Sequence, residues 1–222
     1  MPERHASELL PEMRRPYDAD GGLMEDDLAP TWIEQFERWL DEAVDDARLS
    51  EPNSVVLATA DGHGRPSART VLLKGVDERG FVIYTNLESR KGRDALANPN
   101  AALVFDWIEL QRQVVVTGAV ERVSDEDADA YFATRPRGSQ IGAHASAQSR
   151  VIASREELDE ACAAASARYP EGEPVPRPPN WGGLRIAPDT VEFWHGRPNR
   201  LHDRLRYRRD AGGVWVIERL AP

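Results

Sequence analysis

The sequence predicts a mainly β protein, a barrel or sandwich with peripheral helices. Runs rich in β-branched and aromatic residues outnumber the helical patterns and recur at short intervals, without an internal repeat. The chain has 222 residues, of which 41% are hydrophobic and 30% charged, enough to bury a sizeable core in one large domain. We expect residues 31–222 to form this domain and the polar residues 1–30 to form a mobile arm.

The first regular element is a helix expected to begin at Thr31, because Glu34 three residues later completes a capping box. Apolar residues at helical spacing predict its buried face, which comprises Ile33, Phe36, Leu40, Ala43, Val44 and Ala47. Acidic residues line the opposite face, so we interpret this helix as structural.

Strands follow over residues 55–59, 69–73 and 81–85. The glycines of residues 61–64 predict a turn after the first strand. The second and third strands are predicted to form a hairpin whose loop ends in Gly80.

Beyond the hairpin, residues 89–98 predict a short helix that ends before Pro99. Ser124 is expected to cap a helix, and Ser154 with Glu157 to open another that runs to about Arg168. The intervening donor-rich segment 135–140 and the polar segment around Gln148 and Ser149 are interpreted as loops, and the proline-rich segment 170–179 as a connector. The remaining strands are expected over residues 101–107, 113–123, 183–186, 191–195, 204–208 and 214–218.

Composition and charge exclude several classes of function. The net charge of −10 argues against nonspecific nucleic-acid binding. Cys162 is the single cysteine, so a disulfide within the chain is impossible and nothing indicates an oxidising compartment. No apolar run approaches the roughly 20 residues of a membrane span, and the charged N-terminus lacks an apolar signal region. We therefore expect a cytoplasmic protein.

A cluster of cations surrounds the predicted hairpin. Lys74 and Lys91 are the only lysines in the chain, and Arg69 and Arg90 lie beside them. A lysine ammonium is a compact point charge on a flexible stem and suits a phosphate group. Arg90 and Lys91 also fall in the first turn of a predicted helix, where a bound anion would relieve the conflict with the helix dipole. From this stretch alone, two solvated surface lysines are an equally good interpretation.

Further candidate anion-binding groups are Arg135 with Ser139, and Arg200 with His202 and Arg204. Their number suggests one large polyanion or two phosphorylated ligands. The five histidines show no metal-ligand spacing, so no metal site is predicted. The sequence also lacks a Gly-x-Gly-x-x-Gly motif after a strand, a Walker loop and a Gly-x-Ser-x-Gly elbow.

Several long motifs in a fixed order carry a resemblance that runs from about Arg14 to Pro222. They are Arg69-Thr-Val-Leu-Leu-Lys74, Tyr84-Thr-Asn86, Ser89-Arg-Lys91, Arg135-Pro-Arg137, Ser139-Gln-Ile-Gly142, Gln148-Ser149, Trp181-Gly-Gly183, Glu192-Phe-Trp194, Arg200-Leu-His-Asp-Arg204 and Arg219-Leu-Ala-Pro222. In these motifs the chain resembles the pyridoxine (pyridoxamine) 5′-phosphate oxidases.

The resemblance implies a split β-barrel of the FMN-binding type and a homodimer that holds FMN between its subunits, so that no monomer owns a complete site. It implies oxidation of pyridoxine 5′-phosphate and pyridoxamine 5′-phosphate to pyridoxal 5′-phosphate in vitamin B6 metabolism. Hydride passes from the substrate to the flavin, and O2 reoxidises the flavin and yields H2O2, with ammonia also released from the amine.

Roles of individual residues are likewise implied by the resemblance. FMN would be bound by Arg69, Thr70, Val71, Leu72, Leu73, Lys74, Tyr84, Thr85, Arg90, Lys91, Gln113, Gln148, Ser149, Trp194 and Arg204. The substrate phosphate would be bound by Lys74, Tyr131, Arg135 and Ser139. Arg200, Leu201 and His202 would contact the pyridine ring, with Arg200 and His202 as the catalytic pair, and Arg14 and Tyr17 would close over the substrate. A structural role remains the alternative for His202.

Three positions depart from the family pattern: Pro16, Glu51 and Asp106. None of them is among the proposed FMN or substrate cations. Two other functions stay open, an FMN oxidase of a related substrate such as a phenazine precursor and a non-catalytic carrier of flavin or pyridoxal phosphate. Arg135, Ser139 and Arg200 favour the phosphorylated pyridine.

Overall fold

The computed structural model describes residues 10–13, 16–17 and 21–222. The chain forms two compact units. Unit 1 comprises residues 1–50, 106–114 and 192–222, and unit 2 comprises residues 51–105 and 115–191. Three strands, β5 to β7, run through both units.

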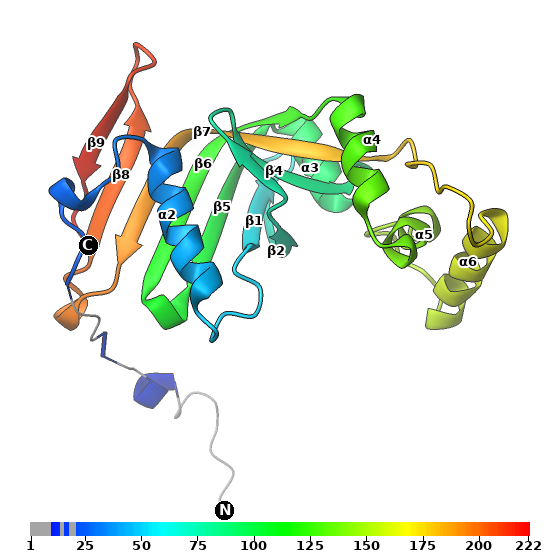
Figure 1. Cartoon of the computed structure of the whole chain (residues 1–222), viewed down its shortest axis with the longest axis horizontal. Helices are drawn as coiled ribbons and strands as arrows, with labels where there is room; N and C mark the ends of the chain where they lie inside the picture. The colour runs from blue at the N-terminus through cyan, green and yellow to red at the C-terminus, as the bar shows by residue number, and fades with distance from the viewer. Residues whose placement is uncertain (1–9, 14–15, 18–20) are drawn as a thin grey trace, which may run out of the picture. The chain divides into compact units, whose positions relative to one another are not determined.

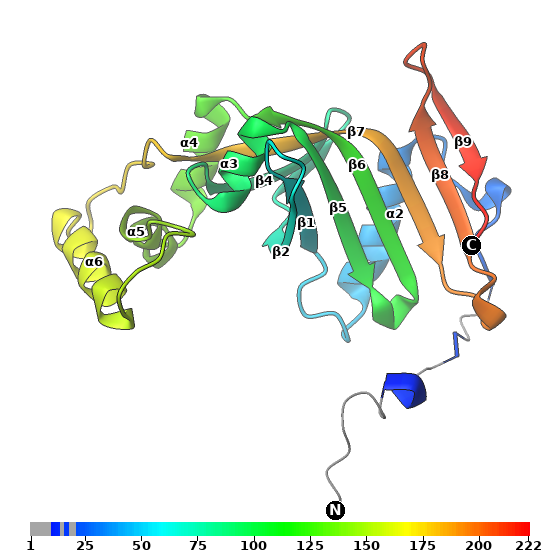
Figure 2. The same cartoon turned by 180° about the vertical axis from the view of Figure 1, so that it is seen from behind.

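Unit 2 is built on a sheet with the strand order β2-β1-β5-β6-β7-β4-β3 (Figure 1). Figure 2 shows β1, β5 and β6 side by side from the reverse direction. Residues of β1 alternate between buried and half-buried, so one face of this strand points into the core. The strands are β1 Ser54–Ala60, β2 Pro66–Leu72, β3 Gly75–Asp77, β4 Gly80–Asn86, β5 Asn100–Trp107, β6 Arg112–Arg122 and β7 Trp181–His195. The two strands predicted near the end of the chain, over residues 183–186 and 191–195, are therefore one continuous strand.

The predicted hairpin has the wrong partner strands. The Arg69 segment belongs to β2, which pairs antiparallel with β1 across the turn at residues 61–64, with Leu57 opposite Arg69. The hairpin that ends at Gly80 is instead made by the short β3 with β4. Gly80 has φ +135°, and a Cβ there would lie 2.1 Å from the Ile186 carbonyl oxygen, so this tight turn requires glycine. The reason is local: the turn at residues 61–64 already folds β2 onto β1.

The helices of unit 2 are α3 Arg90–Ala97, α4 Asp125–Thr134, α5 Arg137–Ala145 and α6 Arg155–Arg168. The hydroxyls of Ser89, Ser124 and Ser154 cap α3, α4 and α6 by accepting backbone N–H groups. These three helices agree with the sequence predictions. The predicted loop over residues 135–140 is wrong, because α5 begins at Arg137.

Tertiary contacts explain this helix. The Arg137 guanidinium donates to the carbonyls of Tyr169, Pro170 and Glu173, beyond the end of α6. Gln140 Nε2 donates to the Phe132 carbonyl at the end of α4. Two of the side chains that suggested a loop, Arg137 and Gln140, therefore use their donors to hold α5 in place. A small core joins these helices to the sheet and comprises Phe132, Ile141, Ala165, Val175 and Trp181.

Unit 1 contains α2 Trp32–Asp45, the strands β8 Asp203–Arg209 and β9 Trp215–Arg219, and the 3-10 turns η1 Leu10–Met13, η2 Glu25–Asp27, η3 Ile108–Leu110 and η4 Pro198–Arg200. Strand β8 pairs with β7 and β9. In the N-terminal region, Leu23 is only 4% exposed, and its backbone N–H donates to Asp203 at 3.1 Å.

The buried face of α2 agrees with the predicted one at Phe36 and Ala43 and differs from it elsewhere. It comprises Trp32, Gln35, Phe36, Trp39 and Ala43. Val44 is 59% exposed, and Ala47 lies beyond the end of the helix. The rings of Trp32 and Trp39 pack at 6.2 Å from Trp215 and 5.2 Å from Phe193, respectively. Because these large rings bury more area than valine or alanine, they decide which face turns inward.

Loss of the α2 cap gives a first testable effect. Thr31 Oγ1 accepts from the Glu34 N–H at 3.3 Å, and Glu34 Oε2 accepts from the Thr31 N–H at 3.1 Å. We expect Thr31→Ala to lower the free energy of unfolding by about 1 kcal/mol, measured by urea denaturation. Ser50→Ala, at an exposed position outside the helix, is the control. Equal unfolding midpoints for the two variants would contradict this expectation.

Candidate active site

Unit 2 contains a cavity of about 670 Å³. It collects many of the residues that the sequence predicted for FMN or substrate: Arg69, Thr70, Val71, Leu72, Lys74, Tyr84, Thr85, Lys91, Tyr131, Arg135, Ser139 and Gln148. They come from β2, β4, α3, α4, α5 and the segments that follow β2, α4 and α5. Residues as far apart in the sequence as Arg69 and Trp181 therefore line one space.

Lys91 is a cation held by neutral groups. Its Nζ donates to Gln148 Oε1 at 2.8 Å, to Thr85 Oγ1 at 3.2 Å and to Ser89 Oγ at 3.4 Å. Among the described residues it forms no ion pair. Burial, with a further effect from the charge of Arg69, lowers the pKa of Lys91. A half-buried ammonium of this kind is poised to bind an anion.

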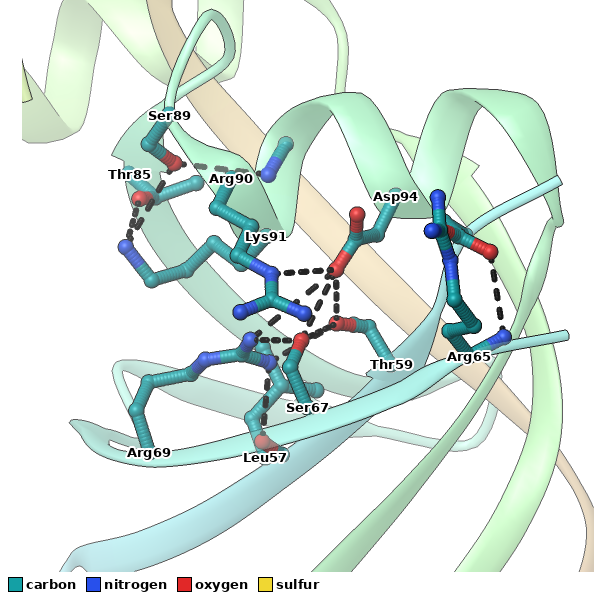
Figure 3. A network of polar contacts seen from close by, with 12 residues as sticks. Leu57, Thr59, Arg65, Ser67, Arg69, Thr85, Ser89, Arg90, Lys91 and Asp94 are labelled. Carbon is teal, nitrogen blue, oxygen red and sulfur yellow. Dashed lines mark hydrogen bonds and ion pairs between the residues drawn. The ribbon is translucent and has the colours of Figure 1, made fainter. Parts of the chain in front are cut away.

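Arg69 lies on β2 and lines the same cavity. Figure 3 shows the polar contacts of its guanidinium. Its Nη1 donates to Thr59 Oγ1 at 2.8 Å and to the Leu57 carbonyl at 3.1 Å, and its Nη2 donates to Ser67 Oγ. Burial lowers the pKa of this guanidinium too. These hydrogen bonds go to neutral oxygens, while the Asp94 carboxylate lies 4.0 Å from Nη2 and compensates part of the charge without a direct hydrogen bond.

A third cation, Arg135, lies against three stacked aromatic rings, which together form an aromatic wall. The rings of Tyr84 and Tyr131 stack at 4.1 Å, and Trp181 stacks on Tyr84 at 5.4 Å. The Arg135 guanidinium lies 4.7 Å from the centre of the Trp181 ring. Its Nη1 is buried and, among the described residues, has no hydrogen-bond partner. Burial lowers the pKa of Arg135. An unsatisfied buried donor of this kind is expected to be completed by a ligand.

Unit 1 holds a separate cluster of rings. Tyr17 lies edge-on to Trp194 at 5.5 Å and to His202 at 5.2 Å, while Trp194 and His202 lie 4.6 Å apart. Gly196 makes room for Tyr17, because a Cβ at this position would lie 2.6 Å from Tyr17 Cδ1.

His202 has one ring nitrogen already engaged. Its Nδ1 accepts the Arg197 N–H at 3.1 Å, so the neutral ring carries its proton on Nε2. Burial, and then the charge of Arg200, lower the pKa of His202. At pH 7 the ring is therefore neutral and presents an N–H donor.

The chain matches family models over most of its length. Residues 40–159 match the model for pyridoxamine 5′-phosphate oxidase, and residues 181–222 match the pyridoxine 5′-phosphate oxidase C-terminal dimerisation region. A pyridoxine/pyridoxamine 5′-phosphate oxidase of Salinispora arenicola is 60% identical over 210 residues, which cover 95% of each chain. The chain belongs to the pyridoxine/pyridoxamine 5′-phosphate oxidase family.

Other members and solved structures agree with this family assignment. A pyridoxine/pyridoxamine 5′-phosphate oxidase of Cupriavidus necator is 55% identical over 213 residues, covering 96% of this chain and 99% of the relative. The crystal structure of PhzG from Burkholderia lata, in complex with tetrahydrophenazine-1-carboxylic acid, superposes with a TM-score of 0.82 at 34% identity and covers 90% of this chain and 98% of that one.

A pyridoxamine 5′-phosphate oxidase-related, FMN-binding protein from Nostoc punctiforme superposes with a TM-score of 0.69 at 19% identity, covering 88% of this chain and 99% of that one, which shows the fold alone. The predicted fold class, mainly β with peripheral helices and of the split-barrel type, is confirmed.

Some residues that the oxidase-family resemblance assigned to the site lie outside the cavity. In unit 2, Leu73 is buried, Arg90 Nε lies 3.9 Å from Asp94 Oδ2, and Ser149 lies in a loop with φ +70°. Arg14 falls outside the described residues. The other residues that the resemblance assigned to the site, but that do not line this cavity, belong to unit 1. They are Tyr17, Gln113, Trp194, Arg200, Leu201, His202 and Arg204.

Within unit 1, these residues differ in how free they are to meet a ligand. Arg200 is exposed at the end of η4, with φ +64°, and the neighbouring Leu201 is 69% exposed. Arg204 instead donates to Glu192 at 2.7 and 3.1 Å, so its charge is largely compensated. Gln113 hydrogen-bonds Asp106, whose pKa is raised mainly by burial.

All three departures from the family pattern, Asp106, Glu51 and Pro16, lie outside the cavity. The Glu51 carbonyl accepts the Ser54 N–H at 2.8 Å, and Pro16 is exposed.

The cavity also contains residues that the motif reasoning missed: Asn86, Thr134, Pro136, Gly142, Ala143, Ser146 and Trp181. Asn86, Pro136, Gly142 and Trp181 occur in quoted motifs and could have been found there. The others line the cavity because α4 and α5 meet beside the sheet, and that arrangement leaves no local pattern in the sequence.

The coupling between Arg200 and His202 is directly measurable. We expect Arg200→Gln to raise the pKa of His202, because the cationic guanidinium disfavours the imidazolium. The shift should be partial, since burial is the larger cause. A histidine-detected NMR titration would measure it, with the exposed Arg209→Gln as a control on the same unit. An unchanged His202 titration in both variants would contradict the coupling.

Proposed function

We propose that this protein is an FMN-dependent oxidase of pyridoxine 5′-phosphate and pyridoxamine 5′-phosphate that forms pyridoxal 5′-phosphate with O2 as acceptor. The observation that carries the proposal is the set of incompletely satisfied cations in the unit 2 cavity. They are above all Lys91 and Arg135, whose Nη1 has no hydrogen-bond partner within the part of the chain that the structure describes. Relatives that are 60% and 55% identical carry the same activity in their names.

FMN is the cofactor, and the cavity residues fit it. Its phosphate is a dianion, and each charge-assisted hydrogen bond to such a group contributes roughly 1.5–3 kcal/mol. Arg69 and Lys91 would bind this phosphate, with Gln148 and Thr85 completing the polar wall. When bound, FMN supplies the hydride acceptor for oxidation of the substrate.

The substrate phosphate needs a second group of donors. Arg135 and Ser139 are proposed to bind it, with Lys74 and Tyr131 at the same cavity. The stacked aromatic wall offers an apolar surface beside these donors. A desolvated guanidinium with a free donor would bind a phosphate oxygen at little cost in reorganisation.

Unit 1 is proposed to contribute the residues that act on the pyridine ring. Arg200 would orient the ring and stabilise negative charge, while the neutral His202 would donate from Nε2 or handle a proton there. Tyr17 and Trp194 support His202 by ring packing. Arg14 is proposed to act with Tyr17 in an arm, residues 1–30, that closes over the substrate.

A homodimer is proposed as the active assembly, supported by the match of residues 181–222 to the family's dimerisation region. A complete site is expected only in that dimer. No helix in the described ranges has the length and apolar character that a bilayer crossing requires. The described residues contain no group of three or more potential metal-binding side chains. The cytoplasmic location stays a prediction.

One observation favours the alternative flavin oxidase. The structure of PhzG is a complex with tetrahydrophenazine-1-carboxylic acid and superposes on this chain with a TM-score of 0.82. Its 34% identity is nevertheless well below the 60% shared with the Salinispora relative. Arg135 and Ser139 in the cavity also suit a phosphorylated ligand, so we prefer the hypothesis that the substrates are pyridoxine 5′-phosphate and pyridoxamine 5′-phosphate.

The test is an oxidase assay on the protein reconstituted with FMN. Pyridoxine 5′-phosphate and pyridoxamine 5′-phosphate should each yield pyridoxal 5′-phosphate and H2O2, whereas unphosphorylated pyridoxine should react with a much higher KM. Turnover of a reduced tricyclic acid in place of both would support the phenazine alternative. If neither phosphate ester reduces the bound flavin in an anaerobic single turnover, the result would support a non-catalytic carrier.

A further inference from the structure

Asp94 is a buried carboxylate beside the cavity, but it does not line it. It lies on α3, and its side chain is only 7% exposed. Its Oδ2 accepts from Ser67 Oγ at 2.8 Å and from Thr59 Oγ1 at 3.0 Å (Figure 3). Thr59 and Ser67 are opposite residues in the pairing of β1 with β2. Two neighbouring strands and a helix thus meet at one oxygen atom.

The two hydroxyls lie 3.3 Å from each other. The chemistry of the three kinds of group decides the direction of the hydrogen bonds that these hydroxyls make with Asp94 and Arg69. A carboxylate can only accept, a guanidinium can only donate, and a hydroxyl has one hydrogen to give. Thr59 and Ser67 therefore give their hydrogens to Asp94 and turn their lone pairs toward Arg69. Each hydroxyl is a relay whose orientation is set by the carboxylate.

These contacts restrain Arg69 without using all its donors. A guanidinium has five N–H groups. Two on Nη1 go to Thr59 and Leu57, and one on Nη2 goes to Ser67. The N–H on Nε and the second on Nη2 remain for a cavity ligand, since no other described residue accepts from them. Asp94 itself stays 4.0 Å from Nη2, so it orients the guanidinium through the hydroxyls without a direct hydrogen bond.

We propose that Asp94 is a positioning residue for the cofactor phosphate: through Thr59 and Ser67 it holds Arg69 with two N–H groups directed at that phosphate. This inference rests on the proposed binding of FMN. Asp94 has a second, opposite effect, because its negative charge close to an anion site disfavours the anion. The charge acts at a distance and is shared with Arg69 and Arg90, which lie 4.0 and 3.9 Å away. Positioning acts on a direct charge-assisted contact and is therefore the larger effect.

The test compares FMN and riboflavin binding by apoprotein variants, followed by flavin fluorescence. Asp94→Ala should weaken FMN binding by about tenfold or more, as expected for the loss of one charge-assisted hydrogen bond. Riboflavin lacks the phosphate, so its affinity should not change. Asp94→Asn keeps an acceptor oxygen and should lose less. Glu88→Gln removes a carboxylate next to the start of α3 without touching the relay, and is the matched control.

A double-mutant cycle separates positioning from a general structural role. If Asp94 acts through Arg69, the double variant Asp94→Ala/Arg69→Met should bind FMN no more weakly than Arg69→Met alone. Additive losses, equal losses for FMN and riboflavin, or tighter FMN binding by Asp94→Ala would each overturn the inference. Should Asp94→Ala fail to fold, Ser67→Ala and Thr59→Val remove the relay hydroxyls and take its place in the cycle.

A final measurement does not depend on the proposed function. NMR signals of the Arg69 guanidinium in the apoprotein should report slow rotation in the wild type and faster rotation in Asp94→Ala or in the relay variants. A wild-type protein that takes up no FMN would end the proposed function. Unchanged Arg69 rotation in the variants would instead overturn the positioning role itself.

Discussion

Arg200→Ala is expected to slow turnover by about 100-fold or more, the cost of removing one donor that stabilises charge in the transition state, while FMN binding stays nearly intact. The residues that line the unit 2 cavity all belong to unit 2, whereas Arg200 lies in unit 1. Its side chain is exposed on the η4 turn and is therefore available to a ligand.

The backbone at Arg200 makes the alanine variant a clean probe. Its φ of +64° is strained for any residue that has a Cβ, so alanine neither adds nor removes this strain. Steady-state rates with both phosphate esters and the Kd for FMN are the measurements. Arg200→Lys keeps the charge but loses the planar fork, and should fall between wild type and alanine. Equal loss of FMN affinity and turnover would show that Arg200 belongs to the cofactor site.

Lys91→Met is expected to weaken FMN binding by about 10- to 100-fold, the equivalent of one charge-assisted hydrogen bond to phosphate. Lys91 is surrounded by three neutral oxygens, so its charge is compensated only when an anion binds. The apoprotein should be no less stable, since burial lowers the pKa of Lys91 and thus penalises its charged form. Titration of apoprotein with FMN and urea denaturation measure the two effects.

The same lysine should give FMN binding a pH dependence. The anion favours protonated Lys91, so affinity should fall as the pH rises past the lowered pKa of the free protein, below the ordinary value of 10.5. This dependence should disappear in Lys91→Met. Arg93→Met removes a cation from an exposed position on the same helix and is the matched control. If both variants weakened FMN binding equally, the effect would come from the general electrostatic field of the helix and not from a specific contact of Lys91.

Local signals predicted much of the fold. The cap at Thr31 predicted the start of α2, the serines at 89, 124 and 154 predicted three more helices, and the glycines of residues 61–64 predicted the turn that joins β1 to β2. Each signal depends on groups within a few residues of one another, so the sequence alone contains the necessary information.

Long-range packing decided the rest of the fold. The inward face of α2 follows Trp32 and Trp39 because their rings meet aromatic partners more than 150 residues away. Helix α5 forms where a loop was expected, because Arg137 finds backbone carbonyls beyond α6. No window of the sequence contains both partners of these contacts.

The candidate site, like the fold, was predicted in part from the sequence and decided in part by the tertiary structure. Family motifs, read from the sequence, named the cations Arg69, Lys91 and Arg135 and the pair of Arg200 and His202. The tertiary structure alone revealed that Arg135 keeps a buried donor with no partner among the described residues, and that Asp94 reaches Arg69 through two hydroxyls on adjacent strands. The physical reason is that a side chain's identity is encoded locally, whereas its desolvation and its hydrogen-bond partners depend on elements that meet only in the folded chain.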